Sequence, residues 1–328
     1  MYSKRIVEPD DFDPAQYPPG GKHSFCLEFE ARGDRLSLPV LLARGAKPGK
    51  RLVATAAVHG DEYEGVRAIL DVFEQLDPAR MAGDFLAVPV SNPPAFWALS
   101  RTSPLDGLNL ARVFPGRRDG SPTESIAWRL DRQIIRHADL YIDLHSGGVQ
   151  FLMPAMAGYW AGDERAREAA LAFGAPVVWA HPTVAPGRTI SAACARGIPA
   201  LYTEARGAGR IDSEDLRLFT RGLMNLLRRL AILDGAPEAA PPVTRLYGDG
   251  NIDDGLAAAQ DGFLIPQAGL LDSVTEGQQL GALVDLLGRT IERYQAPRAG
   301  RVALIHACPR VRKGEPVFLI TGEDDAHR

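Results

Sequence analysis

Four side chains that could perform metal-assisted hydrolysis each end, or closely follow, a short apolar run typical of a buried strand. They are His59, Glu62, His145 and Glu204. Two histidines and one carboxylate form the ligand set of a catalytic zinc ion, which keeps a fourth position for water. A further carboxylate, Glu204, is then free to act as general base and general acid. The pattern predicts a hydrolytic metal site.

The His59–Glu62 pair alone is a weak indication, because an acidic residue at this spacing also suits the N-terminus of a helix. A second histidine at the end of another predicted strand, together with the further carboxylate of Glu204, favours the metal site over the helix N-terminus. Asp143 lies two residues before His145 and therefore on the same face of its strand. It either orients His145 as a metal ligand or makes a purely structural hydrogen bond.

Strands and helices alternate through the first two thirds of the chain, which predicts a mainly parallel sheet covered by helices. The apolar runs that predict its strands are 52–58, 85–90, 140–145, 177–180 and 200–205. One predicted helix follows the first run, and a second extends from the Ser121–Glu124 capping box to about His137. A third spans Asp163–Gly174, and a fourth begins at Asp212 or Ser213 and ends at Gly235. In such sheets ligands bind beyond the carboxyl ends of the strands, where the four side chains lie.

The ends of the chain differ from this central part. Residues 1–22 are acidic and proline-rich and are predicted to form an extended arm, and two strands follow at 25–30 and 36–43. We assign residues 23–240 to an α/β domain. Short β runs between glycine-rich turns predict a small all-β domain at 241–328.

Composition excludes several classes of function. The net charge of −4 argues against a protein that binds nucleic acid through its phosphates. Three widely spaced cysteines argue against a disulfide framework and fit a reducing cytoplasm. The N-terminus has no apolar segment typical of a signal peptide, and no apolar stretch is long enough to span a membrane. We therefore expect a cytoplasmic protein that binds neither membrane nor nucleic acid.

Five motifs, in this order, resemble the succinylglutamate desuccinylase/aspartoacylase family of carboxypeptidase-like zinc hydrolases. They are HGDEYEG (59–65), SNPPAF (91–96), LNLARVFPG (108–116), LYIDLHSGG (140–148) and TEARGAG (203–209). The branch most similar in these motifs is that of the N-acetyl-diaminobutyrate deacetylases. The resemblance extends over roughly residues 50–328, into the C-terminal β runs.

The resemblance implies one Zn²⁺ per chain, bound by His59, Glu62 and His145. It implies that Glu204 deprotonates the zinc-bound water and later protonates the departing amine. It also implies that Arg101 helps to polarise the acyl carbonyl.

Arg112, which precedes the FPG tripeptide, would bind the substrate carboxylate as a planar, two-pronged donor. The chain departs from the family here, because Ala111 stands where the family usually has asparagine. Asn109, two residues earlier, is the candidate to replace the missing amide. Without it the site loses a donor for an α-carboxylate, which weakens the prediction of strict amino-acid specificity.

The remaining aromatic and histidine candidates have simpler interpretations. Tyr159 and Trp160 are predicted to form part of the pocket wall. Four histidines without partners at ligand spacing are interpreted as surface or structural residues: His23, His137, His181 and His306.

We therefore expect a zinc-dependent deacylase that cleaves a small N-acyl amino acid or N-acyl amine to a carboxylate and a free amine. Two alternatives stay open: a metallocarboxypeptidase that acts on peptides, and a non-catalytic protein that binds metal or amines. The sequence leaves the oligomeric state open, and the arm 1–22 is the candidate contact in a homo-oligomer.

Overall fold

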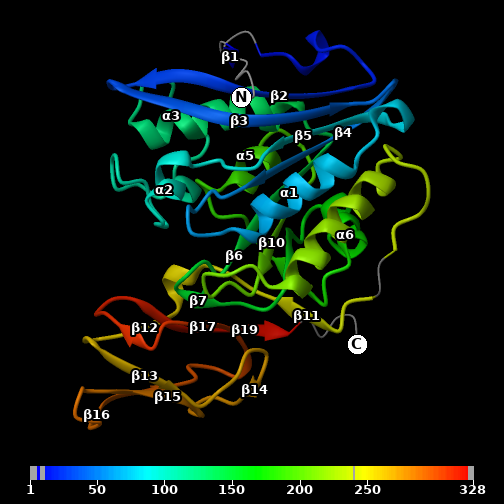
Figure 1. The fold of residues 1–328 in the computed structure, drawn as a ribbon. Coiled ribbons are helices and arrows are strands. Elements are labelled where there is room, and N and C mark those ends of the chain that lie inside the picture. Colours follow the sequence, from blue (N-terminus) through cyan, green and yellow to red (C-terminus); the bar gives the residue numbers. More distant parts are fainter. Residues whose placement is uncertain (1–5, 8–11, 239–240, 324–328) are drawn as a thin grey trace.

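The computed structural model describes residues 6–7, 12–238 and 241–323. In this part of the chain, fifteen strands form one mixed sheet with helices on both faces, and four strands form a separate antiparallel sheet (Figure 1). The predicted α/β class, with a helix-flanked mixed sheet and additional β structure near the C-terminus, is confirmed. None of the helices in the described ranges is both long and apolar enough to cross a lipid bilayer.

The main sheet has the order β1-β2-β3-β5-β4-β6-β10-β8-β9-β11-β19-β17-β14, with β7 and β12 paired to β17 and β19. Its strands are β1 (Ile6–Val7), β2 (Gly21–Ala31), β3 (Asp34–Arg44), β4 (Lys47–Ala56), β5 (Ala82–Val88), β6 (Leu140–Ser146), β7 (Phe151–Leu152), β8 (Met156–Trp160), β9 (Val177–His181), β10 (Ala200–Ala205), β11 (Thr244–Tyr247), β12 (Leu256–Ala257), β14 (Ser273–Val274), β17 (Gly300–His306) and β19 (Pro316–Glu323). Parallel pairing joins β5, β4, β6 and β10, and again β8, β9 and β11. The carboxyl ends of β4, β6 and β10 therefore meet at one edge.

The helices are α1 (Glu64–Gln75), α2 (Pro93–Trp97), α3 (Pro122–Arg129), α4 (Glu164–Phe173), α5 (Thr189–Cys194) and α6 (Ser213–Arg229). One hydrophobic core packs the sheet against α1, α4 and α6, and a second packs the other face against α3 and α5. Strand β4 contributes to both, because Leu52 and Ala54 enter the first core and Val53 the second. Burial on both faces explains its continuous apolar run.

Several predicted helix ends are confirmed by their caps. Asp163 caps α4 by accepting a hydrogen bond from the Arg165 N–H, and Gly174 ends it with a left-handed φ of 83°. Ser121 and Glu124 form the capping box of α3.

Two helices end earlier than predicted. Helix α3 stops at Arg129, and the chain continues through a π-helical turn at Leu130–Ile134 and a 3₁₀ turn at Ile135–His137. Helix α6 stops at Arg229 rather than near Gly235. Helical periodicity persists across such turns, so it does not mark where regular α geometry ends.

The elements near the site that were not predicted include α2, α5 and β8. Helices α2 and α5 have only five and six residues, too few to show a helical period. Strand β8 contains Gly158 at its centre, and a glycine at such a position in the sequence indicates a turn more often than a strand.

The C-terminal β structure divides between the two sheets. Strands β13 (Gly262–Pro266), β15 (Gln279–Val284), β16 (Thr290–Gln295) and β18 (Arg310–Val311) form the separate sheet. Strand β11 instead pairs with β9 and β19, so the main sheet continues past the predicted boundary at residue 240. The three-part division of the chain stays a prediction. At the other end β1 pairs with β2, and residues 1–5 and 8–11 of the predicted arm lie outside the described residues.

Candidate active site

The loop after β4 carries His59 and Glu62. Ala57 adopts a left-handed conformation (φ 47°) just beyond the strand and turns the chain. Asn92, in the SNPPAF motif, holds this turn through its backbone N–H to Ala57 O (3.0 Å) and its side-chain amide to Val58 O (3.3 Å). A motif distant in sequence therefore positions the two candidate ligands.

Gly60 lets a second segment approach the same loop. A Cβ at this position would lie 2.0 Å from the backbone carbonyl carbon of Ala95 in α2, and the Gly60 N–H donates to Ser100 O (3.0 Å). Only glycine permits such close backbone contact. The segment that leads into Arg101 is thereby held against the loop.

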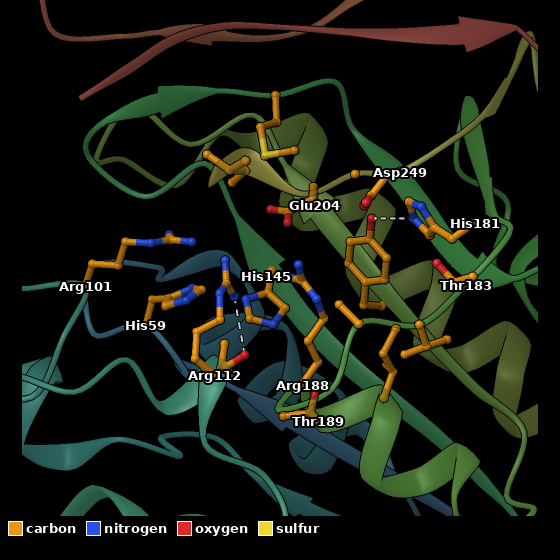
Figure 2. A pocket seen from close by; sticks show the side chains of 18 residues that line it. His59, Arg101, Arg112, His145, His181, Thr183, Arg188, Thr189, Glu204 and Asp249 are labelled. Atoms are coloured by element: carbon orange, nitrogen blue, oxygen red, sulfur yellow. Dashed lines mark hydrogen bonds between the residues drawn. The ribbon is translucent and has the colours of Figure 1, made fainter. Parts of the chain in front are cut away.

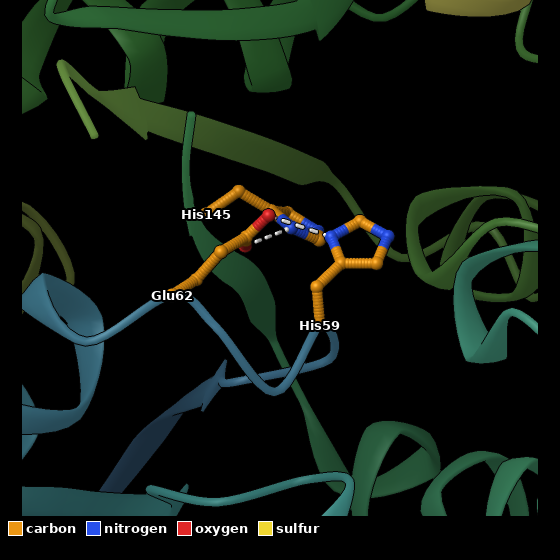
Figure 3. A group of neighbouring side chains, drawn as sticks. All are labelled: His59, Glu62 and His145. Carbon is orange, nitrogen blue, oxygen red and sulfur yellow. Dashed lines mark hydrogen bonds and ion pairs between the residues drawn. The ribbon is translucent and has the colours of Figure 1, made fainter. Parts of the chain in front are cut away.

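His59, Glu62 and His145 meet at one point (Figure 3). Their candidate ligand atoms all lie within 4.8 Å of one another, and all three residues are buried. The two oxygens of Glu62 lie 2.7 Å from Nδ1 of His59 and 2.8 Å from Nδ1 of His145. The Nδ1 atoms of both imidazoles thus face the same carboxylate.

A buried polar network orients His145 from behind. Its Nε2 lies 2.9 Å from Oδ2 of Asp143, and Oδ1 of Asp143 accepts a hydrogen bond from the Thr55 hydroxyl (2.8 Å). The Thr189 hydroxyl, at the start of α5, donates to Oδ2 as well. This network places the Nε2 proton on the Asp143 side and directs Nδ1 toward Glu62. Asp143 was expected either to orient His145 as a metal ligand or to make a purely structural hydrogen bond, and its geometry fits the orienting role.

The ionisation of the three residues suits a cation site. Burial, followed by Arg101, lowers the pKa of His59 to about 4, so its ring is neutral. Burial alone would lower the pKa of His145, but the Asp143 and Glu62 carboxylates raise it well above its usual range. The proton on Nδ1 of His145 therefore lies between this nitrogen and the Glu62 carboxylate. A metal cation bound by both residues would replace that proton. Two imidazoles and one carboxylate fit Zn²⁺ by chemistry and by placement.

Glu204 lies beside this group, at the end of β10. Parallel pairing of β10 with β6 sets Glu204 directly opposite His145. Its side chain is buried, and Oε2 has no hydrogen-bond partner among the described residues. Burial raises the pKa of Glu204 to about 8, although the positive charges of His145 and Arg101 act in the opposite direction. A carboxylate in this state can both accept and return a proton near neutral pH.

Arg101 and Arg112 both line the pocket next to these residues (Figure 2). The Arg101 guanidinium lies 3.5 Å from Glu62 and over the ring of Phe151, 5.9 Å from its centroid. Arg112 donates to Asp253 at 3.1 and 3.3 Å. Both predicted arginines therefore point their charge into the site region.

Asn109 has a different position from the one its predicted role requires. Its side-chain oxygen accepts the Ala111 N–H (2.9 Å) and caps a short 3₁₀ turn. Ala111 lines the pocket, whereas Asn109 is not among the described residues that do. The geometry gives no support to Asn109 as a replacement amide donor.

The pocket is open to solvent and holds about 770 Å³ of empty space, part of which is solvent at its mouth. Tyr159 and Trp160 are not among its lining residues, contrary to the prediction. Their strand β8 lies between β10 and β9, and Tyr159 packs into the hydrophobic core with residues of α4.

The lining residues that escaped the sequence analysis include four titratable side chains: His181, Arg188, Tyr202 and Asp249. His181 had been interpreted as structural or on the surface, yet it ends β9 and faces the pocket. Tyr202 lies two residues before Glu204 on the same strand face. The alternation of side chains along β10 could have indicated Tyr202. The strand-end argument would not have found His181, because β9 runs antiparallel to β10, and Arg188 and Asp249 lie in loops.

Comparison with known proteins agrees with this geometry. Residues 48–230 match the family described as the succinylglutamate desuccinylase/aspartoacylase catalytic domain. The N-alpha-acetyl-L-2,4-diaminobutyric acid deacetylase of Halomonas elongata is 32% identical over 302 residues, which cover 89% of this chain and 87% of that protein.

Two solved structures are also similar over nearly the whole chain. The product-bound ectoine utilization protein EutE (DoeB) from Ruegeria pomeroyi has a TM-score of 0.85 and 29% identity, and the match covers 94% of this chain and 98% of that one. A succinylglutamate desuccinylase/aspartoacylase from Rhodobacter sphaeroides has a TM-score of 0.84 and 27% identity, covering 96% and 98%.

Proposed function

The chain belongs to the succinylglutamate desuccinylase/aspartoacylase family, and from that premise we propose that it is a zinc-dependent deacylase. It hydrolyses the amide bond of a small N-acyl amino acid or N-acyl amine to a carboxylate and a free amine. The observation that carries the proposal is the convergence of His59, Glu62 and His145 beside the unpaired Oε2 of Glu204 in one pocket.

His59, Glu62 and His145 would hold one zinc ion per chain, with Asp143 fixing the orientation of His145. When bound, the ion supplies Lewis acidity and lowers the pKa of a coordinated water toward about 7. The positive charge also favours the ionised form of Glu204, whose burial otherwise favours the neutral form.

Glu204 handles the protons of the reaction. Its carboxylate takes one proton from the water whose oxygen bonds to the acyl carbon, and it returns that proton to the nitrogen as the C–N bond breaks. This proton makes the nitrogen a free amine. The second proton of the water stays on the new carboxylic acid until the acid ionises, and it passes to the amine, so the products are a carboxylate and an ammonium and the proton balance closes. The absence of any hydrogen bond to Oε2 from the described residues leaves this oxygen available to the substrate.

Two arginines complete the proposed site. Arg101 is placed to stabilise negative charge that develops on the acyl oxygen, since it lies 3.5 Å from the ligand Glu62. Arg112 is the proposed anchor for a substrate carboxylate, which would share or displace its contact with Asp253.

The proposal is tested by metal analysis together with a hydrolysis screen on the purified protein. We expect about one zinc per chain and chelator-sensitive release of an amine from N-acetyl or N-succinyl amino acids. N-acetyl-diaminobutyrate belongs in the panel because the Halomonas elongata relative is named for it. A protein that binds no metal and hydrolyses nothing contradicts the proposal.

The same screen separates the two alternatives. A metallocarboxypeptidase would cleave peptides with free C-termini, which the panel therefore also includes. A non-catalytic protein would bind zinc and release no amine from any member of the panel.

Replacing Asp143 with asparagine should weaken zinc binding about tenfold to a hundredfold, the range found when a residue that orients a metal ligand is changed. Asparagine keeps the shape but loses the charge that holds the Nε2 proton of His145. The measurement is the zinc dissociation constant from competition with a chelator. An unchanged constant would show that the Asp143 hydrogen bond is only structural.

We also propose that the protein acts in the cytoplasm. Cys26, Cys194 and Cys308 are all free thiols, which supports a reducing compartment.

A further inference from the structure

Phe151, in the loop after β6, has no part in the proposed hydrolysis. It lies on β7, shortly after the candidate ligand His145 in the chain, and its side chain is buried. Phe151 is not among the described residues that line the pocket, yet it contacts Arg101, which does. A buried aromatic ring outside the pocket lining therefore touches a functional group of the site.

The Arg101 guanidinium has little else to hold it. In the described part of the chain, its one hydrogen bond or ion pair is to Oε1 of Glu62 at 3.5 Å, which is long for such a contact. The same oxygen lies 2.7 Å from Nδ1 of His59. A cation bound at these ligands would neutralise the negative charge that attracts Arg101. Glu62 alone therefore does not fix the guanidinium.

The ring of Phe151 supplies the second contact. Cζ of Arg101 lies over the ring, 5.9 Å from its centroid. The face of an aromatic ring is electron-rich and attracts a guanidinium within about 6 Å, most strongly where water is excluded. The Arg101 side chain is 23% exposed and Phe151 is 4% exposed, so the contact is largely desolvated. The ring keeps this attraction whether or not a cation is bound at Glu62.

Phe151 is itself held firmly. Its backbone N–H donates to Gly147 O at 3.0 Å and closes a tight turn, in which a Cβ on Gly147 would lie 2.2 Å from Phe151 O. Strand β7 pairs with β17 and sets Phe151 opposite His306. The two rings are nearly perpendicular, at 84°, with their centroids 5.7 Å apart. Nδ1 of His306 lies 2.8 Å from Cys308 O, so the neighbouring ring is fixed as well.

The C-terminal β strands reach the site through this residue. Strands β17 and β19 contribute apolar side chains to the hydrophobic core that contains Phe151 and Met153. Figure 1 shows β7 beside β17, where the central part of the chain meets its C-terminal β structure. Met153 lines the pocket, whereas Phe151 contacts Arg101 from within this core. The packing of the C-terminal strands therefore determines where the ring lies.

We propose that Phe151 is a positioning residue for the reaction: its ring holds the Arg101 guanidinium where negative charge develops on the acyl oxygen, and β17 holds the ring. The inference rests on the proposed deacylase function, in which Arg101 stabilises that charge. A merely structural Phe151 would contribute to stability and leave the reaction unchanged. An aliphatic side chain separates the two roles, because it fills the core but has no ring face.

The test is a double-mutant cycle of Phe151→Leu and Arg101→Ala in the zinc-loaded protein, with an N-acyl amino acid that the hydrolysis screen shows to be cleaved. Phe151→Leu should lower kcat about threefold to thirtyfold, the range for a desolvated cation–π contact. KM should change little, because Arg101 acts on charge that develops during the reaction. In the Arg101→Ala background, the same change should alter kcat by less than about twofold. Phe151→Tyr keeps the ring face and should retain a kcat near the wild-type value.

Phe219→Leu is the matched control. Phe219 is fully buried against Phe173 in the core around α4 and α6, outside the pocket. Its replacement should lower the melting temperature and leave kcat unchanged, which separates a general loss of packing from a loss of Arg101 position. If Phe151→Leu does not fold, Phe151→Met takes its place in each comparison, because methionine fills irregular core space.

Crystal structures of the wild-type protein and of Phe151→Leu give a readout that needs no turnover. We expect the Arg101 guanidinium to be displaced in the variant. An unmoved Arg101, or an equal loss of kcat in both backgrounds, overturns the positioning role and leaves the deacylase function intact. A wild-type protein that hydrolyses no panel substrate overturns the deacylase function instead, and the two crystal structures then decide whether Phe151 holds Arg101.

Discussion

Replacing Glu204 with glutamine is expected to lower kcat by about 10²–10⁴-fold while the protein keeps its metal, because the variant loses its general base and acid. Glutamine has nearly the same volume but cannot take up and return a proton. The ligand residues His59, Glu62 and His145 are untouched by the change. The loss should therefore be in kcat and not in zinc content.

The folded state should tolerate this substitution. Oε2 of Glu204 has no hydrogen-bond partner in the described residues, so glutamine breaks no contact at that atom. Burial raises the pKa of Glu204 from its ordinary value of 4.5 to about 8, so wild-type stability decreases as pH rises from about 4.5 to 8. The metal-free Glu204→Gln protein should accordingly melt no lower than the metal-free wild type at pH 8.

The measurements are steady-state kinetics, zinc content and thermal melting of the same preparations. Glu276→Gln, an exposed position outside the pocket, is the matched control and should behave as the wild type. A Glu204→Gln protein with kcat near the wild-type value would remove Glu204 from the mechanism.

Replacing His145 with alanine is expected to abolish turnover by removing the metal. The substitution deletes one of three candidate ligands and also leaves the buried carboxylates of Glu62 and Asp143 without their shared partner. Zinc affinity should fall by more than about a hundredfold, beyond the loss expected when only an orienting residue such as Asp143 is changed.

Thermal melting with and without added zinc gives this prediction a readout that does not depend on activity. Zinc should raise the melting temperature of the wild-type protein, because a ligand that binds only the folded state stabilises it, and should have no effect on His145→Ala. His23→Ala is the control, since His23 lies on β2 and does not line the pocket. Full zinc occupancy in His145→Ala would refute its assignment as a ligand.

Much of the fold near the site follows from local patterns. The run 52–58 predicted a strand buried on both faces, and β4 places its residues alternately in the two cores. Asp163 and Gly174 predicted both ends of α4 correctly. Short elements escaped, because α2 and α5 have too few residues to show a period.

The tertiary structure corrected the pocket wall most strongly. Tyr159 and Trp160 were predicted there from their place after His145, but neither lines the pocket, and Tyr159 packs into the hydrophobic core. His181 was taken as structural because no ligand partner lies near it in sequence. It lines the pocket beside Tyr202, whose hydroxyl lies 2.8 Å from its Nε2, although β9 runs antiparallel to β10.

By itself, the sequence determined the α/β class, the family resemblance and the strand-end positions of His59, Glu62, His145 and Glu204. Such features depend on local periodicity and on the rule that parallel strands end at a common edge. Only the tertiary structure decided that His181 meets Tyr202, and that Arg188 and Asp249 line the same pocket as three of those strand-end residues. The physical reason is that these side chains reach the pocket from separate strands and loops. Their mutual distances depend on how the strands and loops pack, which no pattern within one segment encodes.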